Sequence, residues 1–190
     1  MTRLRYFAPG QLQFITASTY RRAPLFLSPR FCGEFVAALQ SVRSELDFRL
    51  VGWVLMPDHF HLLIWPEAAP STSKIVQQLK QRTAARILEM LRQNPSHRWC
   101  AQMLTRLRLP STVHDHVEYR LWQRRFYPFG IYTEKKRLEK LNYMHANPVK
   151  LGLAATPGEW SWSSFRFYHC GDDSVLRMDR LAKGLTHTQT

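Results

Sequence analysis

Two histidines separated by one residue, His59 and His61, form the first pattern that could carry chemistry. They follow the turn-forming pair Pro57-Asp58 and begin a run rich in β-formers. Because side chains of a strand alternate between its faces, both imidazoles are expected on one face, about 7 Å apart. Two imidazoles placed in this way can chelate a divalent metal. Taken alone, such a pair is more often two histidines on a solvent-facing strand, so the metal interpretation needs a third ligand.

A tyrosine on a predicted helix is the second candidate. A helical projection of residues 133–147 separates two faces. The core face is expected to carry Leu138, Leu141 and His145. The opposite, basic face is expected to carry Lys136, Lys140, Tyr143 and Asn147. A phenol has an ordinary pKa of about 10, so Tyr143 would need a nearby cation or metal to act as a nucleophile.

Asn147 has two possible roles. Its amide oxygen could complete a metal site together with the two histidines. It also precedes Pro148, near which the helix is expected to end, so Asn147 could instead be the helix C-cap.

The elements that must position these residues follow the order β-α-β-β-α-β-α. Strands are expected over residues 11–19, 48–56 and 59–65, with a short strand and a turn within 119–131. Helices are expected over residues 28–46, 71–92 and 133–148, the first two beginning at Ser28-Pro29 and Ser71. This order predicts an α+β fold, an antiparallel sheet with helices packed on one face.

Residues 1–170 are expected to form a single domain, followed by a polar tail over 171–190 that frays. Residues 94–118 show no clear period and are expected to form a loop or insertion that contacts DNA. This segment holds a second His-x-His pair, His114 and His116, which ranks below the first because no strand pattern surrounds it. The aromatic segment Trp160–Phe167 is expected to pack on the body of the domain.

The charge indicates a polyanionic partner. Lys and Arg number 27 against 14 Asp and Glu, a net charge of +13, which fits nucleic acid or an anionic membrane. On so small a domain this charge favours nucleic acid over a merely solubilising surface. The candidates for DNA contact are Lys80, Arg82, Arg124, Arg125, Lys136, Lys140 and Lys150. No apolar stretch is long enough to span a membrane. Three scattered cysteines and a start without a signal peptide are typical of a cytoplasmic protein. A nucleic-acid partner would make it nucleoid-associated.

Four ordered motifs resemble one family. They are Met56–Ile64 around the histidine pair, Leu121–Tyr127, Leu141–Leu153 around Tyr143, and Trp160–Phe165. Together they resemble the REP-associated tyrosine transposases, which belong to the HUH single-tyrosine transposases, over about residues 10 to 170. Two features depart from the family: Pro128 stands where an Asp is common, and residues 94–118 have no clear counterpart.

The resemblance implies a ferredoxin-like, RRM-like sheet. It implies that His59 and His61 bind Mg²⁺ or Mn²⁺, with Asn147 as third protein ligand. Tyr143 would attack a phosphate of single-stranded DNA near a palindromic hairpin and become joined to a 5′-phosphate, and a hydroxyl would reverse the reaction.

Two other functions remain open at the level of sequence. One is a repeat-DNA-binding protein without cleavage activity, and the other is a metal-dependent nuclease without a covalent intermediate. The sequence does not choose between a monomer and a homodimer.

Overall fold

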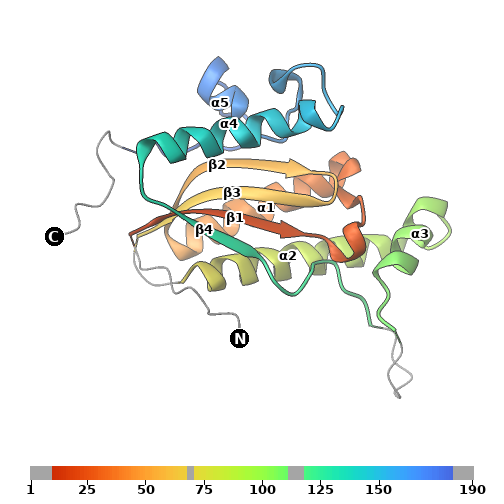
Figure 1. Cartoon of the computed structure of the whole chain (residues 1–190). Coiled ribbons are helices and arrows are strands. Elements are labelled where there is room, and N and C mark those ends of the chain that lie inside the picture. Colours follow the sequence, from red (N-terminus) through yellow and green to blue (C-terminus); the bar gives the residue numbers. More distant parts are fainter. Residues whose placement is uncertain (1–9, 68–70, 111–117, 182–190) are drawn as a thin grey trace.

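A four-stranded antiparallel sheet lies at the centre of the molecule, with strand order β2-β3-β1-β4 (Figure 1). The computed structural model describes residues 10–67, 71–110 and 118–181. The strands are β1 (Leu12–Ser18), β2 (Phe48–Met56), β3 (His59–Pro66) and β4 (Tyr127–Ile131). The first three confirm the predicted strands to within one residue. The whole arrangement is the βαββαβ order of ferredoxin-like folds, so the predicted α+β class is confirmed.

The helices begin largely where the sequence predicted. They are α1 (Pro29–Leu46), α2 (Thr72–Gln93), α3 (Arg98–Leu107), α4 (Glu134–Lys150) and α5 (Phe165–Cys170). Ser71 and Thr133 cap α2 and α4 by accepting hydrogen bonds from backbone N–H groups three residues along, at 3.4 and 3.2 Å. Among the described residues, no helix is both long and apolar enough to cross a bilayer.

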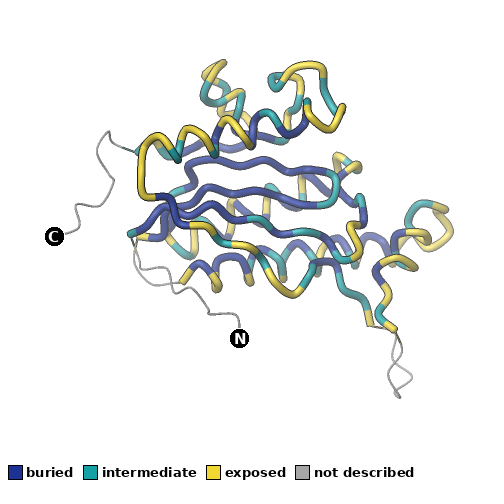
Figure 2. Tube along the Cα trace, viewed as in Figure 1, coloured by how far each residue is buried: buried dark blue, intermediate teal, exposed yellow. Residues whose placement is uncertain are grey.

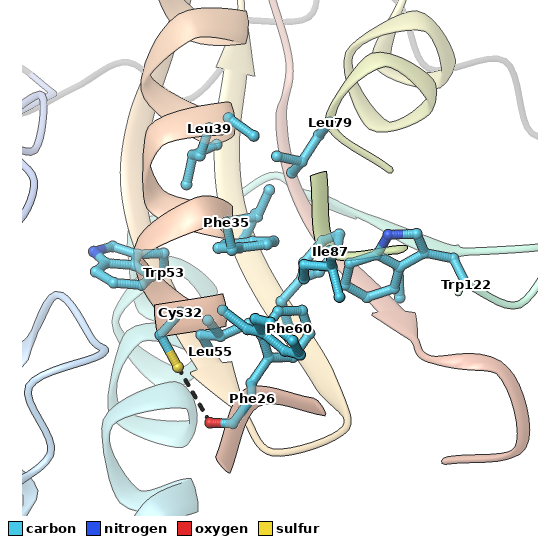
Figure 3. Packing of buried hydrophobic residues seen from close by; sticks show 14 of the residues in the cluster. Phe26, Cys32, Phe35, Leu39, Trp53, Leu55, Phe60, Leu79, Ile87 and Trp122 are labelled. Carbon is cyan, nitrogen blue, oxygen red and sulfur yellow. Dashed lines mark hydrogen bonds between the residues drawn. The ribbon is translucent and has the colours of Figure 1, made fainter. Parts of the chain in front are cut away.

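Helices cover both faces of the sheet (Figure 1). On one face, α1 and α2 pack against Phe60, Leu62 and Ile64 of β3 in the larger core cluster (Figure 3). On the other face, α4 places Leu141 and Met144 over the strands. The expectation of helices on one face holds for α1 and α2. Helix α4 covers the other face, which carries the two histidines, and forms a layer that was not expected.

Gly52 of β2 allows α4 to approach the sheet closely. A Cβ at this position would lie 2.6 Å from Cδ2 of Leu141 and 2.8 Å from Cε of Met144. Gly52 also follows a register shift between β2 and β3. Because α4 carries Tyr143, this contact sets the height of the candidate nucleophile above the sheet.

The segment expected to be a loop, 94–118, contains helix α3. Its apolar residues Trp99, Met103 and Leu107 recur every four positions, and the last two are buried against the larger core. The helix is short and flanked by Pro95 and Pro110, which hid its period. His114 and His116 lie outside the described residues.

Two predicted boundaries at the C-terminal end are wrong. Helix α4 does not end at Pro148 but continues to Lys150, with Leu151 as its C-cap, so Asn147 is not the C-cap. In the described part of the tail, residues 171–181, Leu176 and Met178 are buried in the larger core and do not fray. Their apolar side chains are too few to show a period.

Two other segments lie at the edges of the sheet, one in β4 and one beside β2. The strand predicted within residues 119–131 is β4, at the C-terminal end of that segment and at one edge of the sheet. Pro128 therefore lies in an edge strand and not in a turn. The aromatic segment packs on the body as expected, because Trp162 O accepts a hydrogen bond from Leu55 N and Ser164 N donates to Trp53 O, both at 2.9 Å.

Candidate nucleophile and metal site

The two histidines project from β3 on the face beneath α4, as strand alternation predicted. Their ring centres lie 4.9 Å apart and both side chains are buried. Their neighbours on the strand, Phe60 and Leu62, belong to the core on the opposite face, where Figure 3 shows Phe60. Figure 2 shows β3 buried along its length. The solvent-facing alternative for the pair is therefore excluded.

His61 is held by two residues of the neighbouring strand β1. Its Nδ1 shares a hydrogen bond of 2.7 Å with the Thr16 hydroxyl, and its ring stacks on Phe14 with centres 5.1 Å apart. Its Nε2 is buried and has no hydrogen-bond partner among the described residues. Burial, followed by the charges of His59, Lys140 and Arg22, lowers the pKa of His61 to about 3. The imidazole is therefore neutral at physiological pH, the form that can bind a metal.

His59 is oriented by a carboxylate. Its Nδ1–H donates to Asp58 at 2.7 Å, which leaves Nε2 as the atom that could bind a metal. The other oxygen of Asp58 accepts from Nε of Arg22, also at 2.7 Å. Arg22 adopts a left-handed backbone conformation with φ of 53°, uncommon for a residue with a side chain. Because Asp58 is held from two sides, it fixes His59 and is not free for another role.

Tyr143 lies on α4 at the border between helix and sheet. Its ring centre is 5.5 Å from that of His61 and 6.1 Å from that of Phe14, both in edge arrangements. The side chain is 41% exposed. The helical projection placed Tyr143 off the packing stripe, and the structure adds that one edge of the ring touches the histidine site while the rest remains open.

Two lysines flank the tyrosine. Nζ of Lys140 lies 5.5 Å, and Nζ of Lys150 lies 5.7 Å, from the centre of the Tyr143 ring. The Lys140 ammonium also lies 5.0 Å from the ring centre of Phe14. Positive charge at this place attracts phosphate.

Asn147, one turn beyond Tyr143, is buried, whereas the helical projection placed it on an exposed basic face. Its Nδ2 has no hydrogen-bond partner among the described residues. Leu138, expected in the core, is exposed, while Met144 is fully buried. The projection misplaced these residues because α4 crosses the sheet and only its C-terminal half is covered on that side.

The donor atoms present fit a divalent ion only in part. Among the residues that the structure describes, no group of three or more His, Cys, Asp or Glu side chains could hold a metal. The histidine pair offers two imidazole nitrogens, and the buried amide of Asn147 lies one helical turn beyond Tyr143 on α4. An ion held here would therefore keep several positions for water and phosphate oxygens, as Mg²⁺ commonly does.

The candidate DNA-contact residues divide into two groups. Lys80 and Arg82 are on α2, at the opposite face of the sheet. Lys80 donates to the backbone carbonyls of Gln123 and Arg124 at 2.6 and 3.1 Å, and Arg82 forms an ion pair with Glu45 of α1. The remaining candidates lie before β4 or on α4 and are Arg124, Arg125, Lys136, Lys140 and Lys150. Of these, Lys136 forms an ion pair with Glu139 at 2.8 Å.

Sequence reasoning missed the residues that support the histidines: Phe14, Thr16 and Arg22. They lie about 40 or more positions away along the chain, and nothing in their spacing marks them. Pairing β1 with β3 would have found Thr16, because it lies directly opposite His61 in the register.

The chain is similar to known transposases. A protein of Haemophilus influenzae assigned to the REP-associated tyrosine transposases is 28% identical over 162 residues, 85% of this chain and 83% of the relative. The REP-associated tyrosine transposase of Escherichia coli is 23% identical over 163 residues, 85% of this chain and 80% of the relative. A solved REP-associated tyrosine transposase bound to a REP hairpin has the same fold. It superposes with a TM-score of 0.65 at 19% identity, covering 100% of this chain and 99% of that one.

A sequence profile described as "Transposase IS200 like" matches residues 10–106, just over half of the 190 residues, including β1, β3 and the histidine pair. The resemblance suggested by the four motifs is thereby confirmed. The chain belongs to the IS200-like transposase family, and it is similar to relatives described as REP-associated tyrosine transposases.

Proposed function

We propose that this protein nicks and rejoins single-stranded DNA through a covalent phosphotyrosine at Tyr143. The observation that carries the proposal is the contact of the Tyr143 ring with His61, at 5.5 Å between centres, beneath two lysine ammonium groups. The candidate nucleophile, the buried imidazole pair and positive charge thus lie together on one face of the sheet.

The proposed reaction is a transesterification. The phenolic oxygen of Tyr143 forms a bond to a DNA phosphorus, and the bond from that phosphorus to the 3′ oxygen breaks. The 3′ oxygen takes up a proton, and the 5′-phosphate stays on the tyrosine. A 3′-hydroxyl then attacks the phosphotyrosine and releases the phenol, so no net bond is lost and no energy source is needed. Lys140 and Lys150 would stabilise the charge that develops on the phosphate.

His59 and His61 would hold a divalent ion, with Asn147 as a further ligand. When bound, such an ion polarises a phosphate oxygen and offsets its charge. Thr16 and Asp58 would hold the two rings so that each Nε2 faces the ion. The buried, unpartnered Nε2 of His61 supports this assignment, because a buried imidazole nitrogen without a partner is costly.

Hairpin-bearing DNA is the proposed substrate. A structural relative is described as bound to a REP hairpin, and the net charge of +13 suits a polyanion. We propose that a palindromic hairpin brings the flanking single strand to Tyr143.

A metal-dependent nuclease without a covalent intermediate is less well supported. Such an enzyme needs a carboxylate as ligand or general base. Asp58, the acidic residue bonded to the histidine pair, is held by His59 and Arg22. A DNA-binding protein without cleavage activity would not need the tyrosine beside the histidines.

A trapping experiment tests the proposal. The protein is incubated with hairpin-bearing single-stranded DNA and Mg²⁺ or Mn²⁺, and a denaturing gel is examined for a protein–DNA adduct. We expect an adduct with the parent protein and none with Tyr143→Phe. Tyr132→Phe is the matched control, since Tyr132 is also exposed but lies between β4 and α4 and not on the helix.

Three results would contradict the assignment in different ways. An adduct with Tyr143→Phe would show that another residue is the nucleophile. Cleavage without any adduct would favour the nuclease. Tight binding with neither cleavage nor adduct, under every divalent ion tried, would favour the DNA-binding protein.

A further inference from the structure

The exposed face of edge strand β4 carries aromatic rings beside the candidate active site. Tyr127 is 69% exposed and Phe129 is 41% exposed, both unusual for large side chains in a sheet. Figure 2 shows β4 far more open than β2 and β3. In the register, Tyr127 pairs with Thr16 and Phe129 pairs with Phe14, so both rings stand on the same face as His61.

We propose that Tyr127 and Phe129 form a stacking site for unpaired bases of single-stranded DNA, next to Tyr143. The inference rests on the proposed function in taking DNA as the ligand, and it adds the place where the bases bind. Aromatic side chains stack on bases with little sequence preference, because every base has a π-face.

The spacing of the two rings favours an unpaired strand. Alternate residues of a strand are about 7 Å apart, whereas successive bases in a duplex lie about 3.4 Å apart. Rings at twice the duplex spacing suit bases that have been separated from one another. Bases within a duplex are covered by their neighbours and offer no free face to a ring.

The charges around the rings suit a nucleic acid backbone. Nζ of Lys140 lies 5.2 Å, and Nζ of Lys136 lies 6.0 Å, from the centre of the Phe129 ring. Lys140 also lies beside Tyr143, so one ammonium joins the stacking site to the nucleophile. Arg124 and Arg125 are exposed immediately before the strand. A phosphate passing between Phe129 and Tyr143 would meet Lys140.

A second copy of this chain is the other possible occupant of an edge strand. Pro128 argues against it, because proline lacks the N–H that a further strand would need and commonly protects sheet edges from pairing. The positive charges along this edge would also repel an identical edge. Single-stranded DNA therefore fits both the chemistry and the charge better.

The test measures binding of a fluorescent oligothymidylate, which forms no hairpin, in the Tyr143→Phe background. We expect Tyr127→Ala and Phe129→Leu each to weaken binding by about 5- to 150-fold. Tyr127→Phe and Phe129→Tyr, which keep the rings, should bind as the parent does. Tyr132→Ala is the matched control: Tyr132 is 60% exposed but follows the strand and is not expected to contribute.

Two further measurements separate stacking from charge and from misfolding. Duplex DNA should bind the ring variants within about twofold of the parent. The slope of log affinity against log salt should not change for the ring variants, whereas Lys140→Gln should make it shallower by about 0.7. Circular dichroism and thermal unfolding establish that each variant is folded.

Unchanged oligothymidylate affinity in folded ring variants would overturn the stacking site. An equal loss of duplex binding, or a shallower salt slope, would also overturn it. Self-association of the parent that Tyr127→Ala abolishes would assign this face to a second copy. The adduct assay tests the proposed function separately. If the parent forms the adduct but the ring variants bind oligothymidylate as tightly as their background does, only the stacking site is overturned.

Discussion

At the scale of single residues, the site depends on how the second nitrogen of each imidazole is occupied. Asp58 accepts a hydrogen bond from His59 Nδ1, and Thr16 engages His61 Nδ1. When Nδ1 of His61 donates to the Thr16 hydroxyl, Nε2 keeps the lone pair that a metal requires. A hydroxyl one strand away thus decides whether His61 can act as a ligand.

We therefore expect Thr16→Val to weaken Mn²⁺ binding by about 10- to 100-fold, the usual effect of removing a partner of a ligating histidine. Valine has nearly the same shape as threonine but cannot form a hydrogen bond with Nδ1 of His61. Paramagnetic resonance of titrated Mn²⁺ measures the affinity without any DNA or catalysis.

Thr16→Ser is the matched control for this experiment, because it retains the hydroxyl and should keep the affinity within about threefold of the parent. Equal Mn²⁺ binding by Thr16→Val and the parent would show that Thr16 does not set the tautomer of His61. The histidine pair itself was predictable from its spacing. Thr16 was not, since its role exists only once β1 and β3 are in register.

At the scale of elements, the site is made where α4 crosses the sheet. Strand β3 supplies the histidines and α4 supplies Tyr143, and the two meet because Leu141 and Met144 of α4 rest against Gly52 of β2. Helix α4 could be predicted from its cap and charge pattern, but its approach to the sheet could not. The distance of α4 from the sheet depends on Gly52 of β2, which has no side chain to hold the helix away.

Gly52→Ala should consequently displace α4. The added methyl group would lie within 3 Å of Leu141 and Met144 unless they shift, and both are buried. We expect the free energy of unfolding to fall by about 1–3 kcal/mol, as for other overpacked cores. Adduct formation should fall more than this loss of stability explains, because Tyr143 would move away from His61.

Chemical denaturation and the adduct assay measure the two effects. Gly158→Ala is the matched control, since a Cβ there would meet only ordinary contacts with Phe165, the nearest at 3.5 Å. If Gly52→Ala lost stability but formed adduct at the parent's rate, the position of α4 would not limit the chemistry.

At the scale of the whole molecule, positive charge is divided between two faces of the sheet. The sequence indicated a nucleic-acid partner from the total of +13, and it could not say which charges face that partner. Arg82 and Lys80 appeared equivalent to Lys140 and Lys150 in the sequence. In the structure the first pair holds α1, α2 and the 123–124 segment together, whereas the second pair flanks Tyr143.

This division predicts how the affinity for DNA of two variants depends on salt concentration. A cation that contacts a phosphate of single-stranded DNA contributes about −0.7 to the slope of log affinity against log salt, because binding releases counterions. Lys150→Gln should therefore make the slope shallower by about 0.7. Arg82→Gln removes the same charge from the opposite face, where Glu45 already neutralises it, and should leave the slope unchanged.

Anisotropy titrations of hairpin-bearing DNA at several salt concentrations measure both slopes in the Tyr143→Phe background. The two variants lose one positive charge each, so any effect of net charge alone would appear equally in both. Equal changes in slope would mean that DNA contacts both faces of the molecule. A change for Lys150→Gln alone would place the phosphate backbone on the face of the sheet where Tyr143 and the histidine pair lie.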